Sequence, residues 1–273
     1  MKKGNFERIL RGLDNGGRVA DGEGRLLDTR YYFGEDMLAA AQGITNDGRY
    51  LYCAGTVKAF KYNGFSKIDL ATGEVVLRRG KYMPPALAEL GCDHYGGCTY
   101  FENKIYVAIE DAKRRNPCIG VFSADDFEFT GQFKTLAGNI QPNGNLPWCA
   151  ADKENRLLYT GYFHDCDHIN VFSIDDLTFL NAIPISRVVQ HTQGAEMHGG
   201  LIYISCHDSP KKKHIYSIDP GAGEVKLVME RDAGRIVTES EGMTVVDADD
   251  GVRIYQLDVL YPFGLAIRKY ALS

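Results

Sequence analysis

The sequence predicts an all-β fold, a five-bladed β-propeller that takes up residues 1–273 as one domain. Three observations lead to this prediction. A pattern of four short strands with Gly and Asp turns recurs about every 50 residues, as propeller blades do. The pattern opens five times. No linker or shift in composition divides the chain, and 44% hydrophobic residues supply a sizeable core.

Each repeat has a hydrophobic residue followed by tyrosine at the start of its predicted second strand. These pairs are Leu51-Tyr52, Ile105-Tyr106, Leu158-Tyr159, Ile202-Tyr203 and Ile254-Tyr255. Upstream of each pair lies a short run with small residues, which we predict to be the first strand, beside the central channel. Downstream lie a third strand, a turn and a fourth strand. A two-sheet sandwich also contains many short strands, but five copies in phase favour the propeller.

The fifth repeat supplies only three strands, because Ala266–Tyr270 is its third and the sequence ends at Ser273. We therefore predict that an N-terminal strand completes the last blade. The first candidate is Arg25–Phe33, and the alternative is Phe6–Leu10. Closure of this kind leaves no open seam between the first and last blades.

Composition argues against several partners and compartments. The net charge is −5 and the pI is about 5.8, which disfavours a nucleic-acid surface. No apolar run approaches the roughly 18 residues of a membrane span, and the first residues lack the apolar stretch of a signal peptide. The seven cysteines are an odd number without a tight spacing, which indicates free thiols in a reducing compartment. We expect a cytoplasmic protein that binds neither nucleic acid nor membrane.

The candidate site lies on one face of the ring, where loops lead into the first strands and join second to third strands. Six of the seven histidines map to this face, and His198 is the exception. Titratable groups that converge on a pocket indicate a functional site. The predicted acid/base residues are Glu241, Asp111, His164 and His207. The predicted ligand contacts are Gln42, Tyr95, Trp148, Gln193 and Tyr261.

Two further features of this face carry residues with reactive side chains. His164-Asp165-Cys166-Asp167-His168, with Cys206 and His207 of the next blade, offers metal-ligand chemistry. A solvated turn with hydrogen-bonded Asp side chains is the alternative, and we expect no cofactor. Cys53 is a candidate nucleophile if a neighbouring group lowers its pKa.

Several motifs resemble the plant-and-bacterial type of glutaminyl cyclotransferase, a five-bladed propeller family, from Gln42 onward. They are Gln42-Gly43, Leu51-Tyr52, Asp69-Leu70-Ala71-Thr72-Gly73-Glu74, Trp148, Glu196 and Tyr261-Pro262. The resemblance implies the same scaffold. It also implies altered chemistry, because Cys53 stands where the family has a catalytic Glu and a residue around Val259 where it has a Lys. Gln193 stands where the family has Asn.

We expect an enzyme, hydrolase or acyltransferase/cyclase-like, that acts on a small polar ligand or peptide at the channel mouth. One alternative is a non-catalytic module that binds a metabolite, peptide or glycan on aromatic platforms. The other is a protein-interaction scaffold with its contact surface elsewhere.

Overall fold

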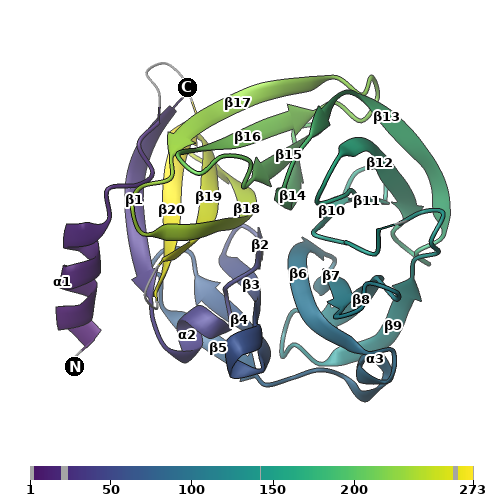
Figure 1. The fold of residues 1–273 in the computed structure, drawn as a ribbon, viewed down its shortest axis with the longest axis horizontal. Helices are drawn as coiled ribbons and strands as arrows, with labels where there is room; N and C mark the ends of the chain where they lie inside the picture. Colours follow the sequence, from purple (N-terminus) through teal and green to yellow (C-terminus); the bar gives the residue numbers. More distant parts are fainter. Residues whose placement is uncertain (1–2, 20–23, 142, 261–263, 273) are drawn as a thin grey trace.

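The strands pair into five four-stranded antiparallel sheets, which surround a central axis (Figure 1). The computed structural model describes residues 3–19, 24–141, 143–260 and 264–272. The predicted five-bladed propeller is confirmed. In blades 1 to 4 the strands run in sequence order from the axis to the rim.

The bounds of the elements follow the predicted repeats. Blade 1 consists of β2 (Gly43–Asn46), β3 (Tyr50–Val57), β4 (Tyr62–Asp69) and β5 (Val75–Gly80). Blade 2 consists of β6 (Cys92–Phe101), β7 (Lys104–Asp111), β8 (Cys118–Ser123) and β9 (Phe129–Thr135). Blade 3 consists of β10 (Cys149–Asp152), β11 (Leu157–Thr160), β12 (Cys166–Ser173) and β13 (Phe179–Val189). Blade 4 consists of β14 (Thr192–His198), β15 (Leu201–Cys206), β16 (Lys212–Ile218) and β17 (Val225–Asp232). Blade 5 consists of β18 (Val237–Ala248), β19 (Gly251–Leu260), β20 (Gly264–Leu272) and the N-terminal strand β1 (Gly24–Tyr32). The short helices are α1 (Lys3–Leu13), α2 (Glu35–Leu38), the 3-10 turn η1 (Lys58–Phe60) and α3 (Pro85–Glu89).

The ring closes as predicted, through the N-terminal strand. β1 runs antiparallel to β20, with Gly24 opposite Leu272 at one end and Tyr32 opposite Leu265 at the other. The alternative strand at residues 6–10 is wrong, because this segment lies inside α1. Leu10, one helical turn after Phe6, packs with it against blade 5, and this spacing suits a helix.

The core consists of the layers between neighbouring blades. Alternate residues of a strand face opposite layers, so Tyr52 packs between blades 1 and 2 while Cys53 packs between blades 5 and 1. Tyr106 is buried between blades 2 and 3, and Tyr159 is buried between blades 3 and 4. The seven cysteines are buried and free. None of the helices in the described residues is both long and apolar enough to cross a membrane.

Glycines let the innermost strands approach closely around the axis. A Cβ on Gly43 would lie 2.6 Å from the carbonyl oxygen of Gly96, and one on Gly194 would lie 2.5 Å from the Cα of Gly242. The amide of Gly242 donates to the carbonyl of Gln42 at 2.8 Å, so blades 5 and 1 are joined by backbone at this level. This contact fixes the side chains that precede the glycines at the channel mouth.

Candidate functional site

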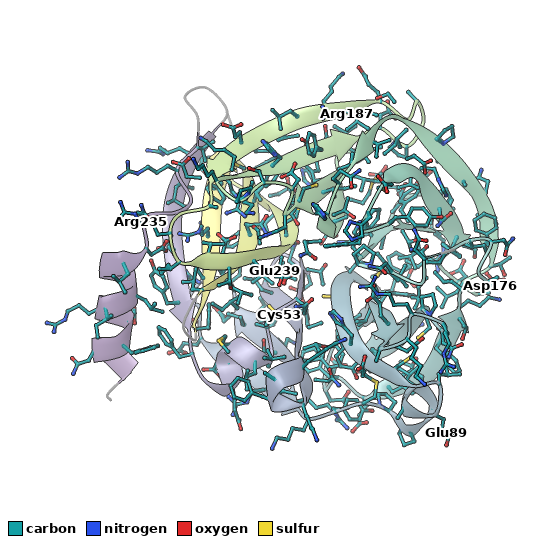
Figure 2. The ribbon with its side chains drawn as sticks, viewed as in Figure 1. Cys53, Glu89, Asp176, Arg187, Arg235 and Glu239 are labelled. Atoms are coloured by element: carbon teal, nitrogen blue, oxygen red, sulfur yellow. The ribbon has the colours of Figure 1, made fainter. Side chains whose placement is uncertain are left out.

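A cavity of about 310 Å³ opens at the channel mouth, above the inner strands. Its lining includes Gln42, Lys58, His94, Glu110, Asp111, Arg114, Asn145, Phe163, Gln193 and Glu239. These residues come from all five blades, so the ring has to close before the site exists. Figure 2 shows Glu239 beside the central axis.

Gln42 connects two titratable groups at this mouth. Its Nε2 donates to Oε1 of Glu241 at 3.2 Å, and its Oε1 lies 3.0 Å from Nε2 of His94. An amide oxygen only accepts hydrogen bonds, so Nε2 of His94 carries the proton and donates. In the neutral imidazole, Nδ1 is then the free acceptor, and it lies 3.9 Å from Oε2 of Glu110.

Glu239 and Glu241 form an acidic pair. Glu241 is 1% exposed, and its pKa is raised well above the usual range by burial and then by the charge of Glu239 and a hydrogen bond to it. The protonated form of Glu241 is therefore favoured. Glu239 lines the cavity and accepts a hydrogen bond from Nε2 of Gln193 at 2.9 Å. One proton shared by two adjacent carboxyl groups is an arrangement used in acid/base catalysis.

The pKa of His94 is lowered, whereas that of Glu241 is raised. Burial, and then the positive charges of Lys58 and Arg114, lower its pKa to about 4, so the imidazole is neutral at pH 7. Burial raises the pKa of Glu110, whose Oε1 accepts from the amide of Leu146 at 2.6 Å. The mouth thus joins a carboxyl group with a raised pKa to a neutral imidazole, through the side chain of Gln42.

Glu196 lies deeper, on β14. Its Oε2 accepts hydrogen bonds from the hydroxyls of Thr45 and Thr244, both at 2.8 Å, and Thr99 lies 3.4 Å from Oε1. The three threonines come from blades 1, 5 and 2. Glu196 therefore links four blades and does not line the cavity.

The structure brings several predicted residues to the mouth. Gln42 and Gln193 line the cavity, and Glu241 lies directly beneath Gln42. Asp111 also lines it, but its carboxylate accepts backbone hydrogen bonds from the turn that follows, at 2.8, 2.7 and 2.5 Å. That carboxylate fixes the turn, and we give it no acid/base role.

Two predicted histidines lie next to the cavity and outside its lining. His164 is exposed and lines a neighbouring hollow of about 240 Å³ that shares Arg114, Asn145 and Phe163 with the cavity. His207 accepts the amide hydrogen of Ser240 on Nδ1 at 3.0 Å, so it supports the strand between the two glutamates.

Two of the three predicted aromatic contacts, Tyr95 and Trp148, are buried and do not line the cavity. Tyr95 is fully buried between blades 1 and 2 and donates to the carbonyl of Tyr82 at 2.7 Å. Trp148 is fully buried between blades 3 and 4, with Nε1 donating to the hydroxyl of Thr192 at 2.9 Å. Neither ring reaches a ligand at the mouth. Tyr261 lies outside the described residues.

The candidate nucleophile and metal ligands take structural positions. Cys53 is buried among hydrophobic side chains, which raises its pKa to about 12. His168 lies between Asp167 and the hydroxyl of Tyr162, at 2.6 and 2.7 Å. Within the described ranges, no three His, Cys, Asp or Glu side chains are arranged to hold a metal ion.

Sequence reasoning passed over part of the lining. Lys58, Arg114 and Asn145 lie in connections whose direction no local pattern reveals. The spacing of Glu239 and Glu241 was a usable signal, because residues two apart on a strand share a face.

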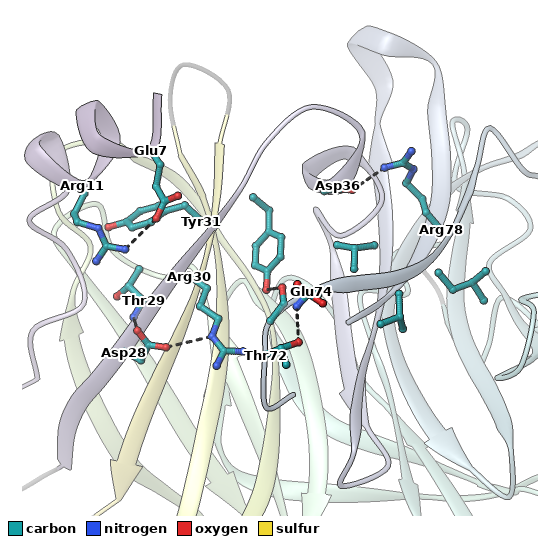
Figure 3. A pocket seen from close by; sticks show the side chains of 15 residues that line it. Glu7, Arg11, Asp28, Thr29, Arg30, Tyr31, Asp36, Thr72, Glu74 and Arg78 are labelled. Atoms are coloured by element: carbon teal, nitrogen blue, oxygen red, sulfur yellow. Dashed lines mark hydrogen bonds and ion pairs between the residues drawn. The ribbon is translucent and has the colours of Figure 1, made fainter. Parts of the chain in front are cut away.

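A larger open groove of about 830 Å³ lies at the rim, between β1 and β5 (Figure 3). Its three arginines already have partners, and Arg11 lies 3.2 Å from Glu7. Arg30 lies 3.2 Å from Asp28, and Arg78 lies 2.6 Å from Asp36. The smaller cavity at the channel mouth has the perturbed titratable groups and is the candidate site.

The fold is a five-bladed propeller, and the mouth of its channel holds the candidate site. Among solved structures, the chain is similar to the glutaminyl cyclase of Myxococcus xanthus, with a TM-score of 0.62 and 15% identity over 92% of this chain and 97% of that one. It is also similar to the allergen Mala s 1 of Malassezia sympodialis, with a TM-score of 0.51 and 8% identity over 91% and 83% of the two chains. No family model and no curated protein matches the sequence. At these identities the likeness shows the fold, which is the scaffold that the sequence motifs implied.

Proposed function

We propose that this protein is an enzyme that catalyses acyl transfer or hydrolysis at the carbonyl group of a small polar substrate bound in the channel mouth. The observation that carries this proposal is the hydrogen-bonded line from Glu241 through Gln42 to His94. Environments that push the pKa values of neighbouring groups apart are a mark of acid/base sites.

The acidic pair supplies the proton transfers. A nucleophile, either water or an amine, attacks the substrate carbonyl and gives its proton to Glu239. The pair then holds two protons, one on each carboxyl group. When the tetrahedral intermediate collapses, the C–N or C–O bond to the leaving group breaks and the pair returns one proton to it. Glu241 acts from beneath Glu239, where burial keeps its own proton in place.

His94 and Gln42 orient this chemistry. The imidazole is neutral, and its Nε2 donates to Gln42, which holds the amide with its Nε2 toward Glu241. Glu239 is exposed at the mouth, whereas Glu241 is buried and accepts its hydrogen bond from Gln42. We therefore give Gln42 a positioning role and Glu239 the role of catalytic residue.

Two observations separate this proposal from the alternatives. Tyr95, Trp148 and Tyr162, which a binding platform would use, are buried in the blade interfaces, and the mouth is lined mainly by polar and charged residues. The glutaminyl cyclase with the same fold is itself an enzyme of acyl chemistry, which supports the reaction class. The buried position of Cys53 argues against the identical reaction.

The test is turnover of a panel of amino-acid amides, esters and dipeptides, followed by mass spectrometry. We expect Glu239→Gln to lower kcat/KM at least 100-fold, in the range for loss of a general base. Glu154→Gln, an exposed glutamate on the opposite face, is the matched control and should retain activity. If no member of the panel is turned over, or if Glu239→Gln is fully active, the proposal is wrong.

A further inference from the structure

Charged groups of both signs line the cavity at the mouth. Lys58, on η1, and Arg114, in the turn after β7, line it from the connections between second and third strands of blades 1 and 2. Glu239 and Gln193 line it from the inner strands beside the axis. Glu110 and Asp111 also line the cavity on the side of Arg114. Asp111 accepts hydrogen bonds from its own turn, and burial raises the pKa of Glu110, so Lys58 and Arg114 remain the groups that can meet an anion there.

Arg114 is held at the mouth by its backbone. Its φ is 53°, a left-handed conformation that costs a non-glycine residue energy. Gly144 packs against this turn, since a Cβ there would lie 1.9 Å from the carbonyl oxygen of Arg114. Among the residues that the structure describes, no carboxylate forms an ion pair with Arg114. Lys58 has Asp93 at 3.7 Å and is otherwise exposed.

Asn145 adds a second, independent observation. Asn145 lines the cavity and is 6% exposed, and in the described structure its buried Oδ1 has no hydrogen-bond partner. A buried acceptor without a partner costs about 1–3 kcal/mol. A molecule that brings an N–H group into the cavity would supply the missing donor.

We propose that the site takes a zwitterion of dipeptide size, with its carboxylate at Lys58 and Arg114 and its ammonium group at Glu239. This inference rests on the proposed function for its location and names the substrate class. The N–H group of such a molecule can pair with Asn145. An inorganic anion would leave the carboxylate side of the cavity and the acceptor of Asn145 unmatched.

The size of the cavity agrees with this class. Its volume of about 310 Å³ lies at the lower end of the range for small-molecule sites. The open side faces solvent at the channel mouth, so a longer peptide would project outward from it. The two charged ends of the ligand then fix its middle, the amide carbonyl, between Glu239 and the rim.

The experiment is calorimetric titration of the full-length protein with three matched probes. L-alanyl-L-glutamine carries both charges, its C-terminal amide lacks the carboxylate, and its N-acetyl derivative lacks the ammonium group. We expect the zwitterion to bind at least tenfold more tightly than either derivative. Arg114→Gln should reduce the preference for the zwitterion over the amide to less than threefold. Arg115→Gln, in the same turn and outside the lining, is the matched control and should keep it.

Each result decides the inference. Equal binding of the zwitterion and its amide overturns it, and so does the absence of binding by all three probes at about 10 mM. Charge-selective binding without turnover of any amide or ester leaves the inference standing and contradicts the proposed function. Turnover of uncharged amides, with no preference for the zwitterion, supports the proposed function and overturns the inference.

Discussion

Arg231 and Asp258 form a two-pronged ion pair inside the ring, with NH1 to Oδ2 at 2.7 Å and NH2 to Oδ1 at 2.8 Å. Both side chains are almost completely buried, and Arg268 Nε donates to the same carboxylate at 2.6 Å. Ser240 Oγ donates to Oδ1 of Asp258 at 2.7 Å. Since Ser240 lies between the two glutamates of the acidic pair, this buried network holds their strand in place.

Replacing Asp258 with Asn should destabilise the fold by roughly 3–5 kcal/mol, because two buried arginines lose their counter-charge. Urea unfolding measures this loss. Asp250→Asn, at an exposed position paired with Arg253, is the control and should cost less than about 1 kcal/mol. Equal effects of the two substitutions would show that the buried pair does not stabilise the ring.

The stability of the wild type should fall between pH 6.5 and about 4 through His94. Its pKa is lowered in the fold, so in this window the unfolded chain binds a proton that the folded protein does not. A shift from 6.5 to about 4 corresponds to roughly 3 kcal/mol. Urea unfolding at a series of pH values should show this loss, and His94→Gln should remove it. His198→Gln, on the opposite face, should leave the pH profile as in the wild type.

Tyr106→Ala and Tyr159→Ala should each destabilise the protein by roughly 3–5 kcal/mol, because each leaves a cavity between two blades. Val76→Ala, at a half-exposed rim position, provides the comparison and should cost far less. Thermal and urea unfolding give the values. A loss below about 1 kcal/mol in both tyrosine variants would contradict this view of the core.

All seven cysteines should titrate as free thiols in denaturant without reductant, as each is unbridged in the structure. In the native protein they should react slowly, because burial raises the pKa of Cys53 to about 12 and shields the other thiols from the reagent. Cys92 and Cys118, with sulfurs 3.7 Å apart, are the two cysteines placed closely enough for oxidation to a disulfide to be checked first. A disulfide recovered from freshly purified protein by peptide mapping would overturn the prediction.

Peptides that begin with glutamine should not be cyclised at an appreciable rate. In the resembling family a carboxylate follows the Leu-Tyr pair of the first blade, whereas Cys53 here is packed among hydrophobic side chains. Ammonia release and mass spectrometry of the peptide provide the measurement. Cyclisation well above the uncatalysed rate, abolished by Glu239→Gln, would show that other residues carry this reaction.

The sequence repeat was sufficient to predict the ring and its closure. The pairs that begin with Leu51-Tyr52 recur in phase, and the missing fourth strand of the last blade left few candidates for closure. The periodicity shows where each inner strand begins, and it therefore predicts Gln42 and Gln193 as residues of the channel mouth, where both line the cavity.

The periodicity of the repeat does not predict the directions of the aromatic side chains. The pairing of β6 with β7 is irregular between Tyr95 and Cys98, and Tyr95 points into a blade interface there. Trp148 precedes the first residue of β10, so no ladder fixes its orientation, and its large apolar ring is buried beside Thr192. A β-bulge or a pocket formed by distant residues determines the orientation of such side chains, and neither can be recognised from the local sequence pattern.

Closure by β1 and β20 has a consequence for biosynthesis. A ribosome makes β1 early, yet its partner strand emerges only roughly 230 residues later, which at about 5–20 residues per second is roughly 10–50 s of translation. Throughout that time one edge of the nascent sheet is without its neighbour, and the mouth that blades 1 and 5 share is incomplete. The mouth is therefore complete only once β20 has paired with β1.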